Sequence, residues 1–254
     1  MKISSRIENI FAHAVAMDNR GMKNTIHCIG SAVYIVNFDH SMILRFKLRK
    51  SELVFENPIS FNANDYDSSD FDEVDGRIVF NTSEGGYVRK KFCRAADYDP
   101  KDIKVLYHKH IKDVDDKYIF YLSRDFCSLL EPELSHIEIS VQKGKLLIRQ
   151  RNVYTGTMIE IEPKDSGFFS ENKLPKSFGP VGLKTKDFTS LFSFCDSLAF
   201  IPAKEFLLVK DHHKKDFDGI LSFCKYDEII NLYHQGGEGG DKIGRKKQKD
   251  RAGE

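Results

Sequence analysis

The sequence has no tryptophan and only five cysteines among its 254 residues. Twenty phenylalanines supply most of the aromatic side chains, so we expect a core built on Phe, Leu and Ile. The cysteines are odd in number and far apart, which excludes the close cysteine spacing of a structural zinc site. They are Cys28, Cys93, Cys127, Cys195 and Cys224. We therefore expect reduced, buried thiols in a cytoplasmic protein.

Long apolar runs and an excess of either charge are also missing. No apolar stretch approaches the roughly 20 residues that a membrane-spanning helix requires, and the N-terminus lacks the apolar region of a signal peptide. Lys and Arg number 39 against 38 Asp and Glu, so the formal net charge is +1. This balance argues against a simple nucleic-acid coat protein. It is compatible with a protein that gathers positive charge on one internal face.

Motifs of the common enzyme classes are absent as well. The sequence contains no Gly-x-Ser-x-Gly, no phosphate-binding P-loop, no Gly-x-Gly-x-x-Gly and no His-Glu-x-x-His. His108 and His110 could be imagined as metal ligands, but solvated histidines in a polar segment are the favoured interpretation. The carboxylates between Asp65 and Glu73 lack the glycine and closing Glu of a calcium-binding EF-hand loop. We therefore expect no catalysis, no cofactor and no bound metal.

A repeated segment is the clearest positive signal. Ser123–Leu130 reads Ser-Arg-Asp-Phe-Cys-Ser-Leu-Leu, and Thr185–Phe192, 62 positions later, reads Thr-Lys-Asp-Phe-Thr-Ser-Leu-Phe. Weaker echoes lie at Asp65–Ser68 and at Ser5–Phe11, again about 60 residues apart. Helix starts near residues 5, 65, 125 and 187 predict a chain of four similar units, because a fixed period indicates repeated structure. The alternative is chance similarity between short helix starts.

Hydrophobic periodicity predicts one helix followed by several antiparallel strands in each unit. Ile7, Ile10, Phe11 and Ala14 form the apolar stripe of a helix over 5–18, with Ser4 or Ser5 as its N-cap. Strands are predicted at 25–29, 32–38, 42–49, 53–55, 59–61, 77–81, 87–93, 118–122, 136–141, 145–150, 153–162, 181–183, 205–210 and 217–225. Further helices are predicted within 64–71, from 123 to about 131, and over 185–197.

These elements predict an α+β fold with two similar domains of two units each. The N-terminal domain is expected at 1–95 and the C-terminal domain at 118–234. Between them, the polar stretch 96–117 with Pro100 is interpreted as an interdomain connector. Residues 235–254 contain almost nothing apolar and are expected to form a disordered basic tail.

Basic residues gather near the predicted helices. Arg6, Arg124, Lys184 and Lys186 lie at or near the starts of three of them, and Arg20 and Lys23 follow the first. Equivalent helices on one surface would form a basic stripe suited to sequence-independent contact with phosphates. The alternative is an ordinary set of solvated helix faces, and the Asp-rich second helix does not fit a uniformly basic surface.

Several segments resemble those of a known family. Met1-Lys-Ile-Ser4, Ile10-Phe-Ala12 and the turn Asn19-x-Gly21-Met22 look like the start of a T-even-type phage sliding clamp. Arg94-Ala-Ala-Asp-Tyr-Asp-Pro100 resembles the segment entering that family's connector, and Ile139–Ile148 resembles its second-domain hairpin. The four-unit plan is also similar to that of the proliferating cell nuclear antigen type of clamp. The Asp-rich second helix and the Gly/Lys-rich tail depart from the family pattern.

The resemblance implies a DNA polymerase processivity factor with the DNA-clamp fold. Three copies would form a homotrimeric ring around duplex DNA, loaded by a clamp loader, and would tether the replicative polymerase without chemistry of their own. By position, the candidates for DNA contact are Arg6, Asn9, His13, Arg20, Lys23, Arg124, Lys184 and Lys186. The candidates for a pocket that binds partner peptides are Val105, Leu106, Tyr107, Tyr226, Ile229 and Ile230. For the second set, plain packing of the connector on the body is an equal alternative.

Two other functions stay open at this point. One is a monomeric adaptor with a clamp-like or unrelated α+β fold that contacts only proteins. The other is an enzyme whose site is assembled from scattered residues such as His108 and His110. A species of three times the 29.2 kDa chain mass would favour the ring over both.

Overall fold

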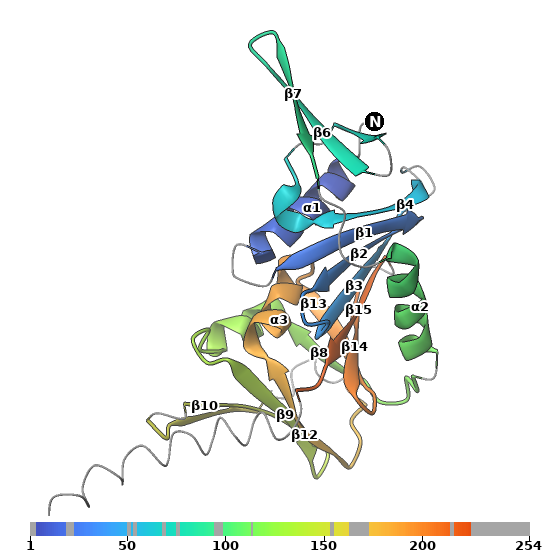
Figure 1. The fold of residues 1–254 in the computed structure, drawn as a ribbon. Coiled ribbons are helices and arrows are strands. Elements are labelled where there is room, and N and C mark those ends of the chain that lie inside the picture. The colour runs from blue at the N-terminus through green and yellow to red at the C-terminus, as the bar shows by residue number, and fades with distance from the viewer. Residues whose placement is uncertain are drawn as a thin grey trace, which may run out of the picture.

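The computed structural model describes residues 4–18, 23–49, 52, 55–67, 70–74, 77–93, 99–112, 114–152, 155–162, 173–213 and 216–224. Within them the chain is α+β, with short helices against antiparallel sheets (Figure 1). This confirms the predicted fold class. The predicted tail at 235–254 lies outside the described residues.

Four units repeat along the chain, and each has a helix or helical turn before three strands. The first contains α1 (Ser5–Asp18), β1 (Asn24–Gly30), β2 (Ala32–Asn37) and β3 (Met42–Lys47). The second contains β4 (Phe55–Asn62), the 3₁₀ turn η1 (Ala63–Asp65), β5 (Phe71–Val74), β6 (Arg77–Glu84) and β7 (Tyr87–Phe92). The third contains β8 (Phe120–Ser123), the 3₁₀ helix η2 (Arg124–Leu129), β9 (His136–Gln142), β10 (Lys145–Arg151) and β11 (Met158–Ile161).

The fourth unit contains β12 (Ser177–Lys184), α3 (Thr185–Ser190) continuing into the 3₁₀ turn η4 (Leu191–Ser193), β13 (Ser197–Pro202), β14 (Phe206–Asp211) and β15 (Phe217–Ser222). The helical elements of the four units therefore begin at residues 5, 63, 124 and 185. This spacing confirms the predicted period. The second helix is only a three-residue turn, and the fourth ends earlier than predicted, which leaves room for the unpredicted strand β13.

The two halves of the chain share one large sheet. Its strand order is β4-β1-β2-β3-β15-β14-β13-β8, so the first four strands come from the first half and the last four from the second. The halves meet where β3 pairs antiparallel with β15 (Figure 1). In this pairing Arg45 lies opposite Asp218. We call this pairing the internal seam. Two smaller sheets, β11-β10-β9-β12 and β5-β6-β7, lie at opposite ends of the molecule.

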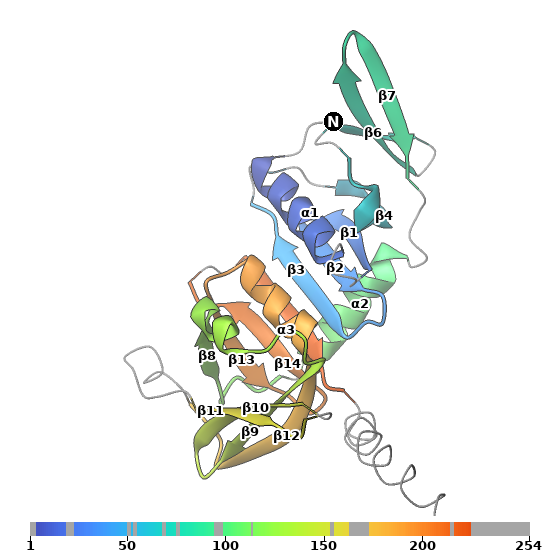
Figure 2. The same cartoon turned by 90° about the vertical axis from the view of Figure 1, so that its left-hand side faces the viewer.

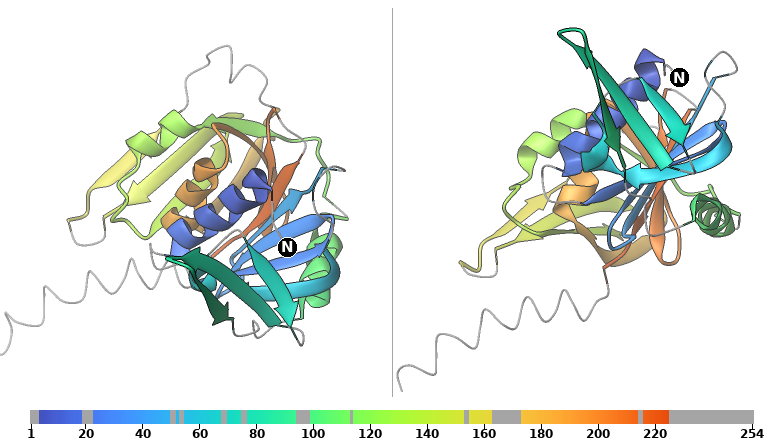
Figure 3. Two further views of the ribbon diagram at one scale, coloured as in Figure 1. Left: turned by 90° about the horizontal axis from the view of Figure 1, so that it is seen from above. Right: turned by 45° about the horizontal axis from the view of Figure 1, so that its top comes forward.

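Helices cover both faces of the large sheet. α1, η2 and α3 lie together on one face, which we call the helix face, and α2 (Pro100–Ile111) lies on the other (Figures 2 and 3). Successive side chains of a strand point to opposite faces, so each face has its own apolar cluster. Phe11, Phe61 and Phe188 belong to the cluster under the helix face, whereas Tyr34 and Tyr107 belong to the cluster under α2.

α1 forms where the apolar stripe predicted it. Ile7, Ile10, Phe11 and Ala14 are buried, and the Ser4 hydroxyl accepts a hydrogen bond from the backbone N–H of Ile7 at 3.3 Å. The hydroxyl thus satisfies one of the backbone donors that every helix start leaves without a partner in the helix. The sequence-based prediction of both the helix and its cap is confirmed.

α2 occupies the segment that was predicted only as a connector. Asp99 caps it, with its carboxylate accepting from the backbone N–H of Lys101 at 2.8 Å, and Pro100 is its first residue. Proline is well tolerated there because the first N–H of a helix has no partner within the helix. Ile103 and Tyr107 are its buried residues, and they anchor the helix to the sheet.

Candidate nucleic-acid interface

The helix face contains a hollow at which α1, η2 and α3 meet. The cavity measures about 420 Å³ and is lined by His13, Ala16, Met17, Arg124, Cys127, Thr189, Phe192 and Ser193. Two predicted DNA-contact residues, His13 and Arg124, therefore lie side by side although they are far apart in the sequence. Thr189 and Ser193 add hydroxyl groups that the sequence analysis did not single out, because neither is charged or part of a known motif.

Arg124 is held in place at the rim of this hollow. Its Nε donates to the backbone carbonyl of Phe192 at 2.8 Å, and its Nη2 lies 3.1 Å from a carboxylate oxygen of Asp196. Asp196 is exposed, so this ion pair is weakened by solvent. The guanidinium is thus oriented by the protein and remains accessible from the helix face.

His13 contributes to the hollow mainly as a neutral group. Its ring meets the ring of Phe194 edge-on, with centroids 5.1 Å apart. Partial burial lowers the pKa of His13, and the positive charge of Arg124 lowers it further. The imidazole can therefore donate or accept a hydrogen bond at neutral pH without adding a full positive charge.

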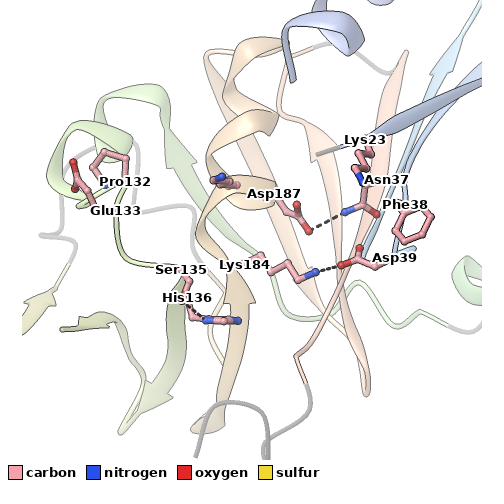
Figure 4. Close-up of a pocket in the computed structure, with 11 residues that line it drawn as sticks. Lys23, Asn37, Phe38, Asp39, Pro132, Glu133, Ser135, His136, Lys184 and Asp187 are labelled. Atoms are coloured by element: carbon pink, nitrogen blue, oxygen red, sulfur yellow. Dashed lines mark hydrogen bonds and ion pairs between the residues drawn. The ribbon is translucent and has the colours of Figure 1, made fainter. Parts of the chain in front are cut away.

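A second hollow brings three of the predicted basic residues together. It measures about 490 Å³ and lies between the two halves of the chain (Figure 4). Lys23 comes from just before β1, Lys184 ends β12 and Lys186 lies in α3. Lys184 forms an ion pair with Asp39, which offsets part of the positive charge. His136 also lines this hollow and was not identified from the sequence.

Asp187 forms the polar floor of the second hollow. It accepts a hydrogen bond from the side-chain amide of Asn37 at 3.1 Å (Figure 4). It also accepts one from the hydroxyl of Ser41. Burial raises the pKa of Asp187, while the Ser41 hydrogen bond and the charge of Lys184 oppose that shift. The carboxylate ties the turn between β2 and β3 to the start of α3. Its role here is to hold the two halves together.

Phe38 is the exposed aromatic residue of this region. Its side chain is 73% exposed, and the ammonium of Lys23 lies 5.8 Å from the centroid of its ring. The sequence analysis assigned Phe38 to the end of a strand. In the structure it belongs to a turn, where His40 has a φ of 58°. The polar residues Asn37, Asp39 and His40 around Phe38 were the signal that could have predicted this turn.

The remaining predicted DNA-contact residues lie apart from these hollows. Arg6 donates to Glu52 at 2.7 Å and to Asp216 at 2.9 Å, so its charge is balanced within the protein. Asn9 is exposed on α1, and Arg20 lies outside the described residues. Arg6 thus links the segment after β3 to the start of β15, and we regard it as the weakest of the candidates.

The predicted partner-binding residues are also separated. Val105 is exposed on α2, Leu106 is half-buried, and Tyr107 is fully buried. The Tyr107 hydroxyl donates to Asp218, and the guanidinium carbon of Arg45 lies 4.7 Å from its ring centroid. Tyr107 therefore packs the connector on the body, which was the alternative interpretation. Tyr226, Ile229 and Ile230 lie outside the described residues.

The two histidines that the sequence analysis considered as metal ligands, His108 and His110, both lie on α2. His108 is exposed on α2, and the His110 ring lies edge-on to Phe206 at 5.5 Å. No group of three or more His, Cys, Asp or Glu side chains that could hold a metal exists among the described residues. None of the five cysteines is in a disulfide. No helix within the described ranges is long and apolar enough to cross a membrane.

Comparisons with known proteins identify the fold. No protein-family profile matches the sequence, and no curated protein matches it significantly. One similar solved structure is a Caulobacter crescentus β sliding clamp, with a TM-score of 0.57, 10% sequence identity, and coverage of 85% of this chain and 64% of that chain. A second is the DNA polymerase III β subunit of Pseudomonas aeruginosa, with a TM-score of 0.54, 11% identity, and coverage of 80% of this chain and 58% of that chain. A third is the PCNA2–PCNA3 complex of Sulfolobus tokodaii, with a TM-score of 0.50, 10% identity, and coverage of 84% of this chain and 96% of that chain.

At this level of identity the similarity establishes the fold alone. The chain has the fold of sliding clamps, as the resemblance predicted. It spans less than two thirds of the length of the bacterial clamps and nearly all of the archaeal chain.

Proposed function

We propose that this protein is a sliding clamp of the tailed-phage type, which encircles duplex DNA as a homotrimer and tethers the replicative DNA polymerase as a processivity factor. The observation that carries the proposal is the clamp fold itself, with α1, η2 and α3 gathered on one face of the shared sheet. The similar structures are themselves described as sliding clamps and as a polymerase subunit. A clamp loader would place the ring on DNA.

The helix face suits loose contact with a DNA backbone. Arg124 is accessible at one hollow, and Lys23, Lys184 and Lys186 surround the other. Contacts of this kind are electrostatic and carry no sequence information, so a duplex can slide past them. Lys184 is paired with Asp39 and Arg124 with Asp196, and such partly offset positive charge fits a protein that holds DNA by encirclement more than by affinity.

The proposal is tested by comparing retention on closed and open DNA. Protein that has been placed on nicked circular plasmid is expected to remain bound during gel filtration in moderate salt. It is expected to dissociate from the DNA ends when the plasmid is linearised. Light scattering over a concentration series supplies the independent measurement, with an expected mass of three 29.2 kDa chains. A strict monomer at high concentration would overturn the ring and favour the adaptor function. Equal retention on circular and linear DNA would overturn encirclement.

Arg124 provides a prediction for the DNA contact. Replacing Arg124 with Glu is expected to weaken binding to duplex oligonucleotides uniformly across sequences and to reduce the slope of log K against log salt by about 1. The physical reason is that one phosphate contact and its counterion release are lost. Fluorescence anisotropy over a salt series measures both quantities.

Lys101→Glu is the matched control, because Lys101 is an exposed basic residue on α2, on the opposite face of the sheet. It makes the same change in net charge and is expected to leave the salt slope unchanged. Equal effects of the two substitutions would show that net charge, rather than the helix face, governs the interaction.

A further inference from the structure

The polar ends of three neighbouring strands surround a third hollow. Asn24 begins β1, Asn37 ends β2 and Asn62 ends β4. The strand pairings bring these ends together, since Asn24 lies opposite Asn37 and Thr25 lies opposite Asn62. The space measures about 420 Å³, and its lining includes Asn24, Asn37, Asn62, Asn64, Asp18 and Asp65. Because four of these residues are asparagines, we call it the amide hollow.

One hydrogen-bond acceptor in the lining of the amide hollow has no partner. Asn24 is 2% exposed, and its Nδ2 donates to the backbone carbonyl of Ala14 at 3.2 Å. Its Oδ1 is buried and accepts no hydrogen bond from any residue that the structure describes. A buried acceptor without a partner is costly, and a donor group on a ligand would remove that cost. The hollow therefore favours a ligand that brings an N–H or O–H group.

Two carboxylates extend this preference for donor groups. Asp18 ends α1 and Asp65 ends η1, and both line the amide hollow. Ionised carboxylates accept hydrogen bonds and donate none. Asn62 and Asn64 are exposed and add amide groups, which can pair with the edge of a nucleobase. The lining thus suits a planar ligand whose edge combines amino donors with ring acceptors.

Phe38 and Lys23 stand where the amide hollow meets the hollow shown in Figure 4. Both residues line both hollows, together with Asn37 (Figure 4). The ring of Phe38 is largely exposed, and the ammonium of Lys23 lies 5.8 Å from its centroid. Exposed aromatic rings beside positive charge bind unpaired nucleotides, because a base stacks on the ring while its phosphate meets the cation.

A cationic ligand would suit this arrangement less well. A guanidinium could also donate to the carboxylates and stack on an aromatic ring. Its charge would, however, meet the ammonium of Lys23, which already lies near the ring of Phe38. A phosphate is attracted by the same ammonium. The volume of about 420 Å³ falls within the usual range of about 300–1,000 Å³ for small-molecule sites.

We propose that the amide hollow binds one unpaired nucleotide whose base carries an exocyclic amino group. The base lies against the ring of Phe38 and donates to Asn24 Oδ1 and the carboxylates, and the phosphate lies beside Lys23. Adenine, cytosine and guanine carry such an amino group, whereas thymine does not. The nucleotide can be free in solution or part of a single strand, since its chemistry is the same. The site lies within one chain and does not depend on the proposed ring.

The base preference of the wild-type protein is the first test. Titration calorimetry is expected to show that dAMP and dCMP bind about tenfold more tightly than dTMP, because thymine leaves acceptors of the hollow without a donor. Equal affinities for dAMP and dTMP would overturn the assignment of the base. Absence of binding by all three nucleotides would overturn the site.

The aromatic platform is tested by removing one ring at a time. Phe38→Ala is expected to weaken dAMP binding by about tenfold or more, because the stacking surface is lost. Tyr118→Ala is the matched control. Tyr118 is also exposed, with the ammonium of Lys117 5.4 Å from its ring centroid, but it lines neither hollow. Equal losses in the two variants would overturn the stacking on Phe38.

Two further variants test the two ends of the nucleotide. Asn24→Ala is expected to reduce the preference for dAMP over dTMP, and its melting temperature reports whether the chain stays folded. Lys23→Gln is expected to bring the affinity for dAMP down to that for deoxyadenosine, because the phosphate contact is lost. Unchanged preferences in the folded variants would overturn these contacts. If Asn24→Ala does not fold, the wild-type selectivity and Phe38→Ala still decide the proposal.

Oligonucleotides show where the nucleotide comes from. A deoxyadenylate single strand that binds the wild type and loses affinity in Phe38→Ala would assign the site to unpaired nucleotides of a strand. Binding of dAMP without binding of that strand would assign it to free nucleotides. A blunt duplex is expected to be insensitive to Phe38→Ala, and an equal loss there would overturn the preference for an unpaired base.

The outcomes also separate this inference from the proposed function. A monomeric protein that binds dAMP with the expected selectivity would overturn the ring and support the nucleotide site. A trimer that is retained on circular DNA but binds none of the nucleotides would support the ring and overturn the site.

Discussion

Replacing Asp218 with Ala is expected to lower the free energy of unfolding by about 3–5 kcal/mol, because removing one partner of a buried ion pair leaves the other charge uncompensated. Asp218 accepts from Arg45 Nε at 2.7 Å and from the Tyr107 hydroxyl, and its carboxylate lies 3.2 Å from the Lys47 ammonium. These partners come from β3 and α2, whereas Asp218 itself lies in β15. Urea denaturation measured with two independent probes checks the value.

Asp216→Ala is the matched control for this prediction. Asp216 lies two positions away and pairs with Arg6 at 2.9 Å, but both side chains retain contact with solvent. A pair of this kind contributes about 0.2–1 kcal/mol. If both substitutions cost the same, the carboxylate of Asp218 would have no special role at the internal seam.

The pH dependence of the folding stability tests the role of Asp218 independently. Burial would raise the pKa of Asp218, but hydrogen bonds from Arg45 and Tyr107 and the charge of Arg45 hold it below its ordinary value. A depressed carboxyl pKa contributes stability above the ordinary pKa of about 3.9, and this contribution is lost as pH falls through the folded-state value. The stability difference between wild type and Asp218→Asn should therefore be largest near neutral pH and shrink in acid. A difference that grows in acid would contradict the assignment.

Replacing Phe200 with Ala is expected to destabilise the protein by about 3–5 kcal/mol, because it removes a large buried ring and leaves a cavity. Phe200 is fully buried on β13 between Phe120 and Phe188, with ring centroids at 5.2 Å and 5.4 Å. These rings hold α3 against the sheet, so the loss should also disturb the helix face. Thermal and chemical unfolding measure the stability change.

Phe38→Ala is the control for the Phe200 variant. It removes the same side chain at a turn where the ring is 73% exposed, and surface changes of this kind usually stay within about 0.5 kcal/mol. A similar cost at both positions would show that Phe38 is packed in solution. Phe38→Ala also separates stability from DNA binding, because Phe38 borders the hollow with Lys23, Lys184 and Lys186.

The sequence determined the elements whose signals are local. The stripe Ile7, Ile10, Phe11 and Ala14 predicted α1, since side chains three and four positions apart share one face of a helix. The period of about 60 residues predicted where each unit begins, and the strands predicted at 136–141 and 145–150 form the hairpin of β9 and β10. These signals depend on neighbouring residues, so they can be recognised without knowledge of the fold.

The elements that were missed depend on distant partners. β13 contains the continuous apolar run Leu198–Ile201, which periodicity cannot assign to a strand or a helix. It is a strand because β8 and β14 pair with it on both sides. Only Ile103 and Tyr107 of α2 are buried. Two apolar positions in a polar segment were too few to indicate an amphipathic helix from the sequence.

The candidate sites divide in the same way. The residue types of the basic helix starts were visible in the sequence, but only the tertiary structure grouped Lys23 with Lys184 and Lys186, and His13 with Arg124. It also joins Arg6 by a hydrogen bond to Asp216, 210 positions away, and Tyr107 to Asp218, 111 positions away. The sequence by itself determined the repeat, the fold class, and the number and sequence positions of the charged residues. The tertiary structure decided which charges meet, because burial and strand pairing join residues that no local pattern connects.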